Sequence, residues 1–289
     1  MHQVWAALNG RKVKMYQRHN KIGGTAANVI AHGAVYESNL YTLWQELTGE
    51  KPPLDLSNKL PVRMGQATEQ FNREWFGEIT GFQVEESVGV SVSNERDYCV
   101  GQMDGFVIDD DFISGGKALF EAKHTHGYNY QLKIPKTIIH VAELYYPQIQ
   151  HYLYVTNLKR AYLSVFFDNG RSHDWQLLQR NDEFINQLLV KIDAFWYCVK
   201  NKIPPKMDGA SMKIPEITKG KIETIDANHP SSNAWASAAT SFLENKASAS
   251  TFNASKKALK DLAPSDAWRT EGFGVSVVNS GTRRTVNAL

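Results

Sequence analysis

Cysteine is scarce in this sequence. Only Cys99 and Cys198 occur among 289 residues, both in hydrophobic surroundings. Two cysteines are too few for a cysteine-ligated zinc site or an iron–sulfur site. Such low cysteine usage is typical of a reducing compartment, so we expect the protein to lie in the cytoplasm.

Long hydrophobic runs and a strong net charge are also missing. No run of about 18 apolar residues occurs, and the opening residues MHQVWAALNGRKVK lack a signal-peptide pattern, so we expect no membrane role. The net charge is only +2, which by itself does not indicate a nucleic-acid partner. Hydrophobic residues make up 42% of the chain, enough to bury a core in one large domain or in a domain with an appendage.

Positive charge is nevertheless concentrated near the N-terminus. The basic residues of this cluster are Arg11, Lys12, Lys14, Arg18 and Lys21. Such a cluster either contacts phosphates or forms a solvated basic face. Charge patterning leaves both alternatives open.

The segment VGQMDGFVIDDDFISGGKALFEAKH carries the strongest functional signal. Its parts 101–108 and 117–123 read as two strands, separated by a turn rich in Asp, Ser and Gly. Side chains alternate across a strand, so Glu121 and Lys123 should share one face, within reach of Asp104 on the partner strand. The segment therefore predicts two carboxylates and one ammonium group in a small space. The three acids of the turn itself, at 109–111, are interpreted as a solvated turn.

Two carboxylates this close repel each other unless a cation lies between them, and oxygen ligands favour Mg²⁺ or Mn²⁺. A bound divalent ion polarises a phosphoryl oxygen and activates a water for attack on a phosphodiester. A solvated lysine is protonated at pH 7, which favours an electrostatic role for Lys123 over that of a general base. A triplet of this kind also occurs by chance, so the flanking sequence has to decide.

The remaining pattern predicts elements in the order α, α, α, β, β, β, α, β, β, α. This order indicates an α/β (α+β) fold with a central mixed sheet flanked by helices. Helices are expected in GGTAANVIAHG, in SNLYTLWQELTG with Ser38 as N-cap, and over 62–80, 139–156 and 181–201. Strands are expected over 83–92, in the hairpin, and in RAYLSVFFD and SHDWQLLQR around the turn NGR.

The helix over 62–80 carries a candidate acid. Its main apolar stripe is formed by Met64, Ala67, Phe71, Trp75 and Ile79. Glu69 lies about 200° around the helix from Phe71, beside Arg73, off that stripe. Taken by itself, the position is typical of an exposed helix glutamate.

A composition break follows the helix over 181–201. Ile203, Pro204 and Pro205 interrupt the pattern, after which Lys, Ser, Ala, Asn and Thr dominate. We therefore predict a first domain over 1–205 and a C-terminal appendage over 206–289. The appendage should contain a linker, a helix over 232–262 and a small hairpin with its turn at 279–281.

Several segments, in this order, resemble the YqaJ-like viral recombinase family, which groups with lambda exonuclease in the PD-(D/E)XK nuclease superfamily. The similarity spans most of residues 15–205. KIGGTAANVIAHG resembles the family's small-residue segment, and RMGQATEQF resembles its glycine followed four positions later by a glutamate. GQMDGF and LFEAKH resemble its metal-site strands, YYPQIQHYLYVT its Q-x-Q helix, and DEFINQLLVKIDAFWYCVKNKIPP its closing helix and proline pair. The resemblance implies a restriction-endonuclease-like PD-(D/E)XK nuclease domain over 1–205.

The resemblance also implies a role for each matching residue. Asp104 and Glu121 would be metal ligands, and the carbonyl of Ala122 could add another. Glu69 would reach the metal directly or through water. Lys123 would be the catalytic lysine.

Further positions complete the expected site. Pro147 should start or kink a helical segment, which would place Gln148 in its first turn. Gln148 would orient Lys123 or the substrate phosphate, whereas Gln150 lies 200° away and would face elsewhere. The candidate DNA contacts are Lys21, Thr25, Arg18, Arg73 and His124. The sequence departs from the superfamily pattern at Met103, where proline is usual; this changes backbone stiffness but removes no ligand.

The resemblance implies a Mg²⁺-dependent phage-type exonuclease, with Mn²⁺ able to substitute. It would resect double-stranded DNA ends so that a single-strand annealing protein can load. Processive relatives form rings, which implies a homo-oligomer such as a ring trimer, and a phage or prophage gene implies the cytoplasm of a bacterial host. Two alternatives stay open: a DNA endonuclease on the same fold, and a catalytically inactive DNA-binding or assembly protein, against which the complete set of acids and lysine argues.

Overall fold

The computed structural model describes residues 21–35, 38–108, 116–129, 134–206, 211–219, 221–245, 249–280 and 283–289. Arg18, the basic residues before it and the three acids at 109–111 lie outside the described residues. Our expectations for those positions therefore stay predictions.

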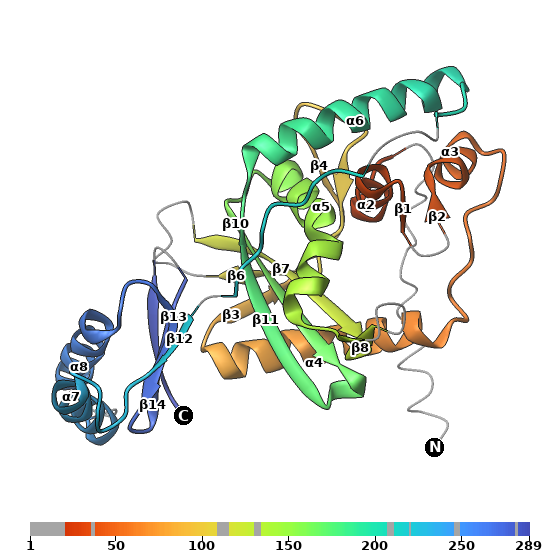
Figure 1. The fold of residues 1–289 in the computed structure, drawn as a ribbon. Coiled ribbons are helices and arrows are strands. Elements are labelled where there is room, and N and C mark those ends of the chain that lie inside the picture. Colours follow the sequence, from red (N-terminus) through yellow and green to blue (C-terminus); the bar gives the residue numbers. More distant parts are fainter. Residues whose placement is uncertain are drawn as a thin grey trace.

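A mixed sheet forms the centre of the molecule (Figure 1). Its strand order is β11 (Ser172–Gln179), β10 (Arg160–Phe167), β7 (Lys117–Thr125), β6 (Gly105–Ile108) and β3 (Gln83–Glu86). β10 is parallel to β7, and the other neighbours are antiparallel. All residues of β10 are buried, as expected for the central strand of a sheet covered on both faces. The predicted mixed sheet is confirmed.

Alternation along the strands divides the core into two clusters. Phe120 and Tyr162 pack toward α4 (Leu60–Thr80). Leu119 and Leu163 point to the opposite face, into a cluster that also contains residues of α2 (Gly24–His32), α5 (Ile138–Thr156) and α6 (Asp182–Asn201). In the described chain, α4 therefore packs on one face of the sheet, and the helices of the larger cluster lie on the opposite side (Figure 1).

Smaller elements connect these layers. They are β1 (Ala34–Val35), β2 (Ser38–Asn39), α3 (Leu40–Thr48), β4 (Ser91–Val92), β5 (Val100–Gly101), β8 (Tyr128–Asn129), β9 (Ile134–Pro135) and the short 3-10 turn η1 (Asp168–Gly170). The N-cap of α3 is Asn39 rather than the predicted Ser38, because Asn39 Oδ1 accepts the Thr42 N–H at 3.0 Å while Thr42 Oγ1 accepts the Asn39 N–H.

The strand predicted over 101–108 is shorter than expected. Gly101 belongs to β5, which pairs with β4, and β6 begins only at Gly105. Asp104 lies in the bend between them, where its Oδ2 accepts the Ala122 N–H at 2.8 Å. The Asp104 side chain thus replaces a backbone hydrogen bond of the sheet, and Asp104 itself lies outside the regular strand.

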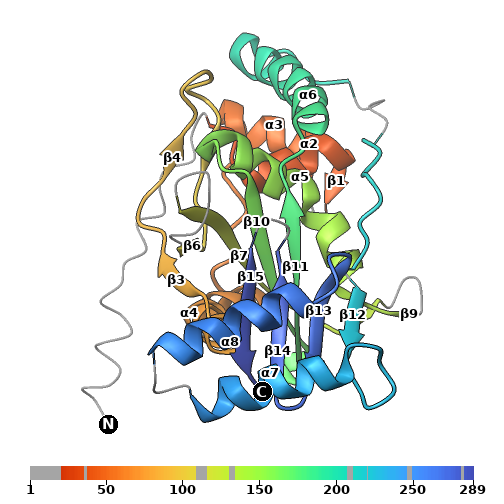
Figure 2. The same ribbon diagram turned by 90° about the vertical axis from the view of Figure 1, so that its left-hand side faces the viewer.

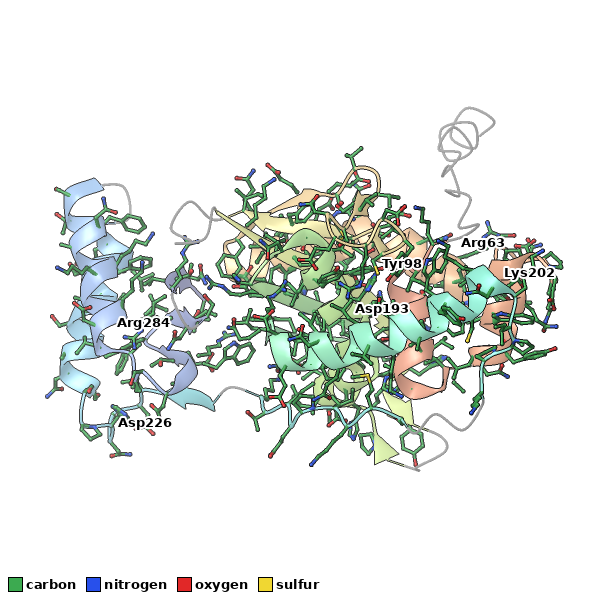
Figure 3. The ribbon with its side chains drawn as sticks, turned by 90° about the horizontal axis from the view of Figure 1, so that it is seen from above. Arg63, Tyr98, Asp193, Lys202, Asp226 and Arg284 are labelled. Carbon is green, nitrogen blue, oxygen red and sulfur yellow. The ribbon has the colours of Figure 1, made fainter. Side chains whose placement is uncertain are left out.

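The β4–β5 pair is attached to α6 through a partly exposed polar contact. Arg96 donates from Nε and Nη2 to the two carboxylate oxygens of Asp193, at 2.8 and 2.9 Å. Tyr98 donates its hydroxyl to Asp193 and stacks on Trp196 (Figure 3). Because Val100 of this pair donates its N–H to the Ile22 carbonyl at 2.9 Å, the contact also fixes the start of α2.

The apolar stripe predicted to be the main one on α4 is not the buried face of that helix. Phe71 is 54% exposed and Trp75 is 37% exposed. The helix instead buries the face that carries Arg73, Phe76 and Thr80. The prediction rested on the spacing of apolar residues only. The polar residues of the buried face are tolerated there because each of them forms a hydrogen bond.

Pro147 does not begin a helix. It lies inside α5, which runs without interruption from Ile138 to Thr156. Side chains of α2 contact the backbone of α5 on either side of this proline.

The C-terminal part contains more structure than predicted. It has a second sheet of β12 (Lys221–Thr224), β13 (Ala267–Gly272), β14 (Val275–Asn279) and β15 (Arg284–Ala288). The single helix predicted over 232–262 is divided into α7 (Ser232–Glu244) and α8 (Ala249–Leu262), which lie together on one side of this sheet (Figure 2). On the other side, Val278 and Trp268 pack against the cluster around Phe82 and Trp175 of the first sheet.

Residues 211–219 are part of the first core as well. Met212 is buried there, and its N–H donates to the Ala31 carbonyl at 2.8 Å. The domain boundary near residue 206 stays a prediction. None of the helices in the described part of the chain is long and apolar enough to span a membrane.

Candidate active site

Glu121 and Lys123 lie side by side on β7, as the alternation of the strand predicts. Glu121 is 1% exposed, and Lys123 Nζ donates to its Oε1. Lys123 Nζ also lies 3.3 Å from the Ala122 carbonyl oxygen and 4.7 Å from the centre of the Tyr145 ring. The lysine is thereby held between an acid, a carbonyl and an aromatic face of α5.

Gln148 reaches the same carboxylate from α5. Its Nε2 donates to Glu121 Oε1 at 2.6 Å. Gln150 faces away, as expected, and donates to the Gln179 carbonyl at 2.8 Å. The structure therefore places Gln148, and not Gln150, at Glu121.

Two residues of α2 support this part of α5, and sequence reasoning missed both. Asn28 Oδ1 accepts the Gln148 N–H at 2.7 Å, and His32 Nε2 donates to the Leu144 carbonyl at 3.2 Å. Leu144 and Gln148 are four residues apart, so the Leu144 carbonyl and the Gln148 N–H are the acceptor and the donor of one turn of α5. The only signal in the sequence was an Asn and a His at helical spacing within an otherwise small, apolar helix.

Asp104 and Glu69 approach the site from the other side. Asp104 is anchored to the Ala122 N–H, and Glu69 Oε1 accepts from Arg73 Nη1 at 2.7 Å. Glu69 is close enough to Asp104 and Glu121 for their charges to influence one another. The structure thus brings together all five predicted catalytic side chains, although they come from α4, β7, α5 and the bend before β6.

Burial dominates the electrostatics of the acids. Burial, and after it the charge of the neighbouring Asp104, raise the pKa of Glu121 to about 8 although Lys123 acts in the opposite direction. Burial also raises the pKa of Asp104 and, together with the charge of Asp104, that of Glu69. The positive charges of the protein therefore do not balance the negative charges of this carboxylate cluster.

Lys123 responds in the opposite direction. Burial by itself would lower its pKa, but Glu121 and Asp104 outweigh this effect and raise the Lys123 pKa. The lysine is therefore a cation at neutral pH, in agreement with the electrostatic role predicted for it.

One oxygen of Glu121 is available for a further partner. Among the described residues, no donor contacts Glu121 Oε2, which is buried. An unpartnered buried carboxylate oxygen beside a second carboxylate is suited to a hard divalent cation. No group of three His, Cys, Asp or Glu side chains is already arranged as a metal cage in the described ranges, so the fit rests on Glu121, Asp104 and the Ala122 carbonyl.

The predicted DNA contacts are dispersed. Lys21 donates to the Asp97 carbonyl at 2.7 Å, and Thr25 is exposed in the first turn of α2. His124 lies on the opposite face of β7 from Lys123, where its Nδ1 is 3.1 Å from Thr68 Oγ1. Arg73 is buried, so it is not the surface group that we expected.

A mixed sheet that presents an acid and a lysine two residues apart on β7, with Asp104 beside them, is the arrangement that the resemblance to PD-(D/E)XK nucleases implied. The chain belongs to the YqaJ-like viral recombinase family, because the model of the YqaJ-like viral recombinase domain matches residues 15–159, half of the chain. The predicted family and fold class are thereby confirmed.

Among solved structures, the chain is similar to LHK-Exo, an alkaline exonuclease from Laribacter hongkongensis. The structure of LHK-Exo with dAMP is 17% identical with a TM-score of 0.48, covering 64% of this chain and 91% of that one. A second LHK-Exo structure is 17% identical with a TM-score of 0.47, covering 70% and 94%. A phage-related exonuclease from Haemophilus somnus 129PT is 12% identical with a TM-score of 0.47, covering 64% and 96%. No curated protein matches the chain.

Proposed function

We propose that the protein is a metal-dependent deoxyribonuclease that resects double-stranded DNA ends as an exonuclease. The observation that carries this proposal is the buried Glu121, in contact with Lys123 and Gln148 and beside Asp104. Membership in the YqaJ-like viral recombinase family supports it. The family also supports a phage origin, with DNA as the substrate.

Mg²⁺ is the proposed cofactor, with Mn²⁺ able to replace it. Asp104, Glu121 and the Ala122 carbonyl would hold the ion, and Glu69 would contact it directly or through water. A bound divalent ion polarises a phosphoryl oxygen and lowers the pKa of its water so that the water can attack at neutral pH.

Lys123 acts as a fixed positive charge. Because Glu121 and Asp104 keep it protonated, it donates hydrogen bonds and cannot serve as the base. In the transition state it would stabilise the negative charge that develops on the phosphoryl oxygens. Gln148 keeps Glu121 Oε1 in place, and Oε2, which is buried without a donor among the described residues, would hold the cation.

Substrate contacts and partners follow from the family. Thr25 and Lys21 at the start of α2, with Arg18, would contact the DNA end. A single-strand annealing protein would load on the resected strand, and a homo-oligomer such as a ring trimer would keep the enzyme on its substrate. The reaction would take place in the cytoplasm of a bacterial host.

The test uses end-labelled linear duplex and closed circular duplex, each with Mg²⁺ or EDTA. We expect loss of the linear DNA only, in Mg²⁺ only, and no loss with Glu121→Ala or Lys123→Ala. Glu74→Ala is the matched control, because Glu74 is an exposed acid of α4 that contacts Gln70. Cleavage of the circle would indicate an endonuclease, and no metal-dependent cleavage of either DNA would refute the nuclease proposal.

A further inference from the structure

Arg73 is held inside the protein by two acceptors. Its side chain is 8% exposed, and a single nitrogen, Nη1, donates to Glu69 Oε1 at 2.7 Å and to the Asp104 carbonyl at 2.9 Å. One guanidinium therefore joins α4 to the bend before β6. Both partners of Arg73 belong to residues that we place at the proposed metal site.

The local backbone is shaped around this side chain. At Gly105, a Cβ atom would lie 3.2 Å from Arg73 Cδ and 2.6 Å from the Glu85 carbonyl oxygen. No larger residue fits there without displacing β3 or the arginine. The glycine after Asp104 thus gives Arg73 its path to the Asp104 carbonyl.

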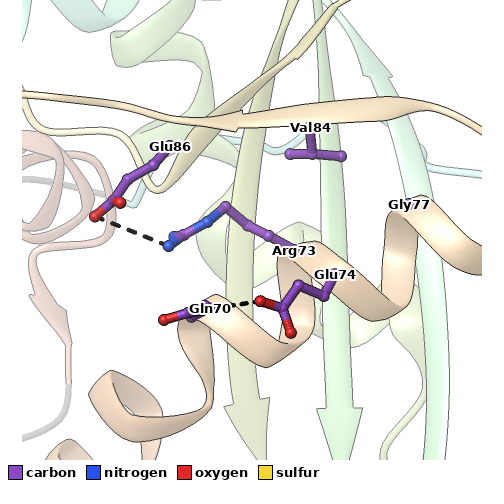
Figure 4. Close-up of a pocket in the computed structure, with 6 residues that line it drawn as sticks. All are labelled: Gln70, Arg73, Glu74, Gly77, Val84 and Glu86. Atoms are coloured by element: carbon purple, nitrogen blue, oxygen red, sulfur yellow. Dashed lines mark hydrogen bonds and ion pairs between the residues drawn. The ribbon is translucent and has the colours of Figure 1, made fainter.

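The surroundings of Arg73 do not suit a DNA phosphate. Its outer side faces a cavity of about 300 Å³ lined by Gln70, Arg73, Glu74, Gly77, Val84 and Glu86 (Figure 4). Glu74 and Glu86 are acidic, and Glu86 Oε1 lies 3.9 Å from Arg73 Nη2. A phosphate in this cavity would meet two carboxylates, which repel it.

We propose that Arg73 is a positioning residue that sets the orientation of Glu69 and of the Asp104 backbone for metal binding. This inference rests on the proposed function. Glu69 comes from the helix on one face of the sheet, whereas Asp104 precedes β6 and contacts β7. In the described part of the chain Glu69 and Asp104 share no direct hydrogen bond, and Arg73 is the donor that joins them.

A different role would give a different result. If Arg73 only neutralised the acids, its removal would leave more negative charge and the metal would bind more tightly. If Arg73 positions Glu69, its removal weakens metal binding even though the site becomes more negative. The sign of the change in metal affinity therefore decides between the two roles.

The experiment compares Arg73→Met with Arg73→Lys, and with Arg63→Met as a control. Arg63 is exposed on the same helix, so its replacement makes the same change in net charge. Metal binding is measured without DNA, from the rise in melting temperature as Mn²⁺ is added. Cleavage of linear duplex in Mg²⁺ then gives kcat and KM for each variant.

For Arg73→Met we expect the half-saturating Mn²⁺ concentration to rise about tenfold or more, with a matching fall in kcat and an unchanged KM for DNA. Arg73→Lys should recover part of the metal affinity, and Arg63→Met should resemble the wild type. In a Glu69→Ala background, Arg73→Met should cause a smaller loss of affinity than in the wild type, because the Arg73–Glu69 contact is already gone and only the contact with the Asp104 carbonyl remains to be removed. If Arg73→Met does not fold, Arg73→Lys decides, because it keeps the positive charge: neutralisation alone predicts Mn²⁺ binding like that of the wild type, whereas a positioning role predicts weaker binding.

Tighter Mn²⁺ binding by Arg73→Met would overturn the positioning role in favour of simple neutralisation. A raised KM with unchanged Mn²⁺ binding would overturn it in favour of DNA contact. Failure of the proposed function is distinguishable from both, because the wild type itself would then show neither a Mn²⁺-dependent melting temperature nor cleavage.

Discussion

Replacing His151 with glutamine should remove an acid-sensitive contribution to stability. His151 lies on α5, one turn beyond Gln148, and is 1% exposed. Its Nε2 donates to the Val100 carbonyl at 2.9 Å. Burial lowers the pKa of His151 from 6.5 to about 4, so the folded protein resists protonation of this ring.

The sign and size follow from proton linkage. Because the folded pKa lies below the unfolded one, the stability contributed by neutral His151 is complete above pH 6.5 and is lost as the pH falls toward 4. One pKa unit corresponds to about 1.4 kcal/mol. The expected loss is therefore about 1 kcal/mol near pH 5.5 and about 3 kcal/mol near pH 4.5.

Urea denaturation at about pH 7.5, 5.5 and 4.5 measures this loss. Glutamine does not titrate, so the wild type should lose stability relative to His151→Gln by the amounts above. Any constant cost of the replacement drops out of the difference, and other acid-sensitive groups such as His173 are present in both proteins. His126→Gln, at an exposed position, is the control and should run parallel to the wild type. If His151→Gln also runs parallel to the wild type, the reasoning is refuted.

The remaining predictions concern the site and the packing around it. Lys123→Met should reduce cleavage by about 100-fold or more while Mn²⁺ still raises the melting temperature, because the fixed charge acts on the transition state; unchanged cleavage would contradict this role. Gly24→Ala should lower the free energy of unfolding by about 1–3 kcal/mol, because its Cβ would lie 2.5 Å from the Tyr152 ring. Gly65→Ala, with nothing within 4 Å of its Cβ, should instead raise it by about 0.5–1 kcal/mol, and two shifts of the same sign in urea denaturation would argue against this packing. Asp193→Ala should cost about 1 kcal/mol and speed proteolysis within 91–101, since it releases the β4–β5 pair; an unchanged digestion pattern would contradict this.

Local patterns predicted the parts of the site that depend on one element. Alternation along β7 placed Glu121 beside Lys123, and helical spacing separated Gln148 from Gln150. Both results follow from the period of a single strand or helix. The order of strands and helices likewise predicted the mixed sheet.

These local patterns could not predict the contacts between elements. The sequence does not show that Asn28 meets Gln148, or that Arg73 turns inward, because both depend on how helices pack. The wrong face of α4 was chosen for the same reason, since Phe71 and Trp75 are apolar but 54% and 37% exposed. Only a hairpin of the second sheet was predicted. β12 pairs with β13 although α7 and α8 lie between them in the sequence, and local periodicity does not reveal such a pairing.

The contact between Asn28 and Gln148 joins residues 120 positions apart, which has a consequence for synthesis. A ribosome adding 5–20 residues per second needs roughly 6–24 seconds to make the intervening chain. During that time α2, a helix of 9 residues, is too short to be stable without its partner. The Glu121 site therefore cannot be completed until α5 has emerged, so the nascent chain lacks the assembled site for at least that time.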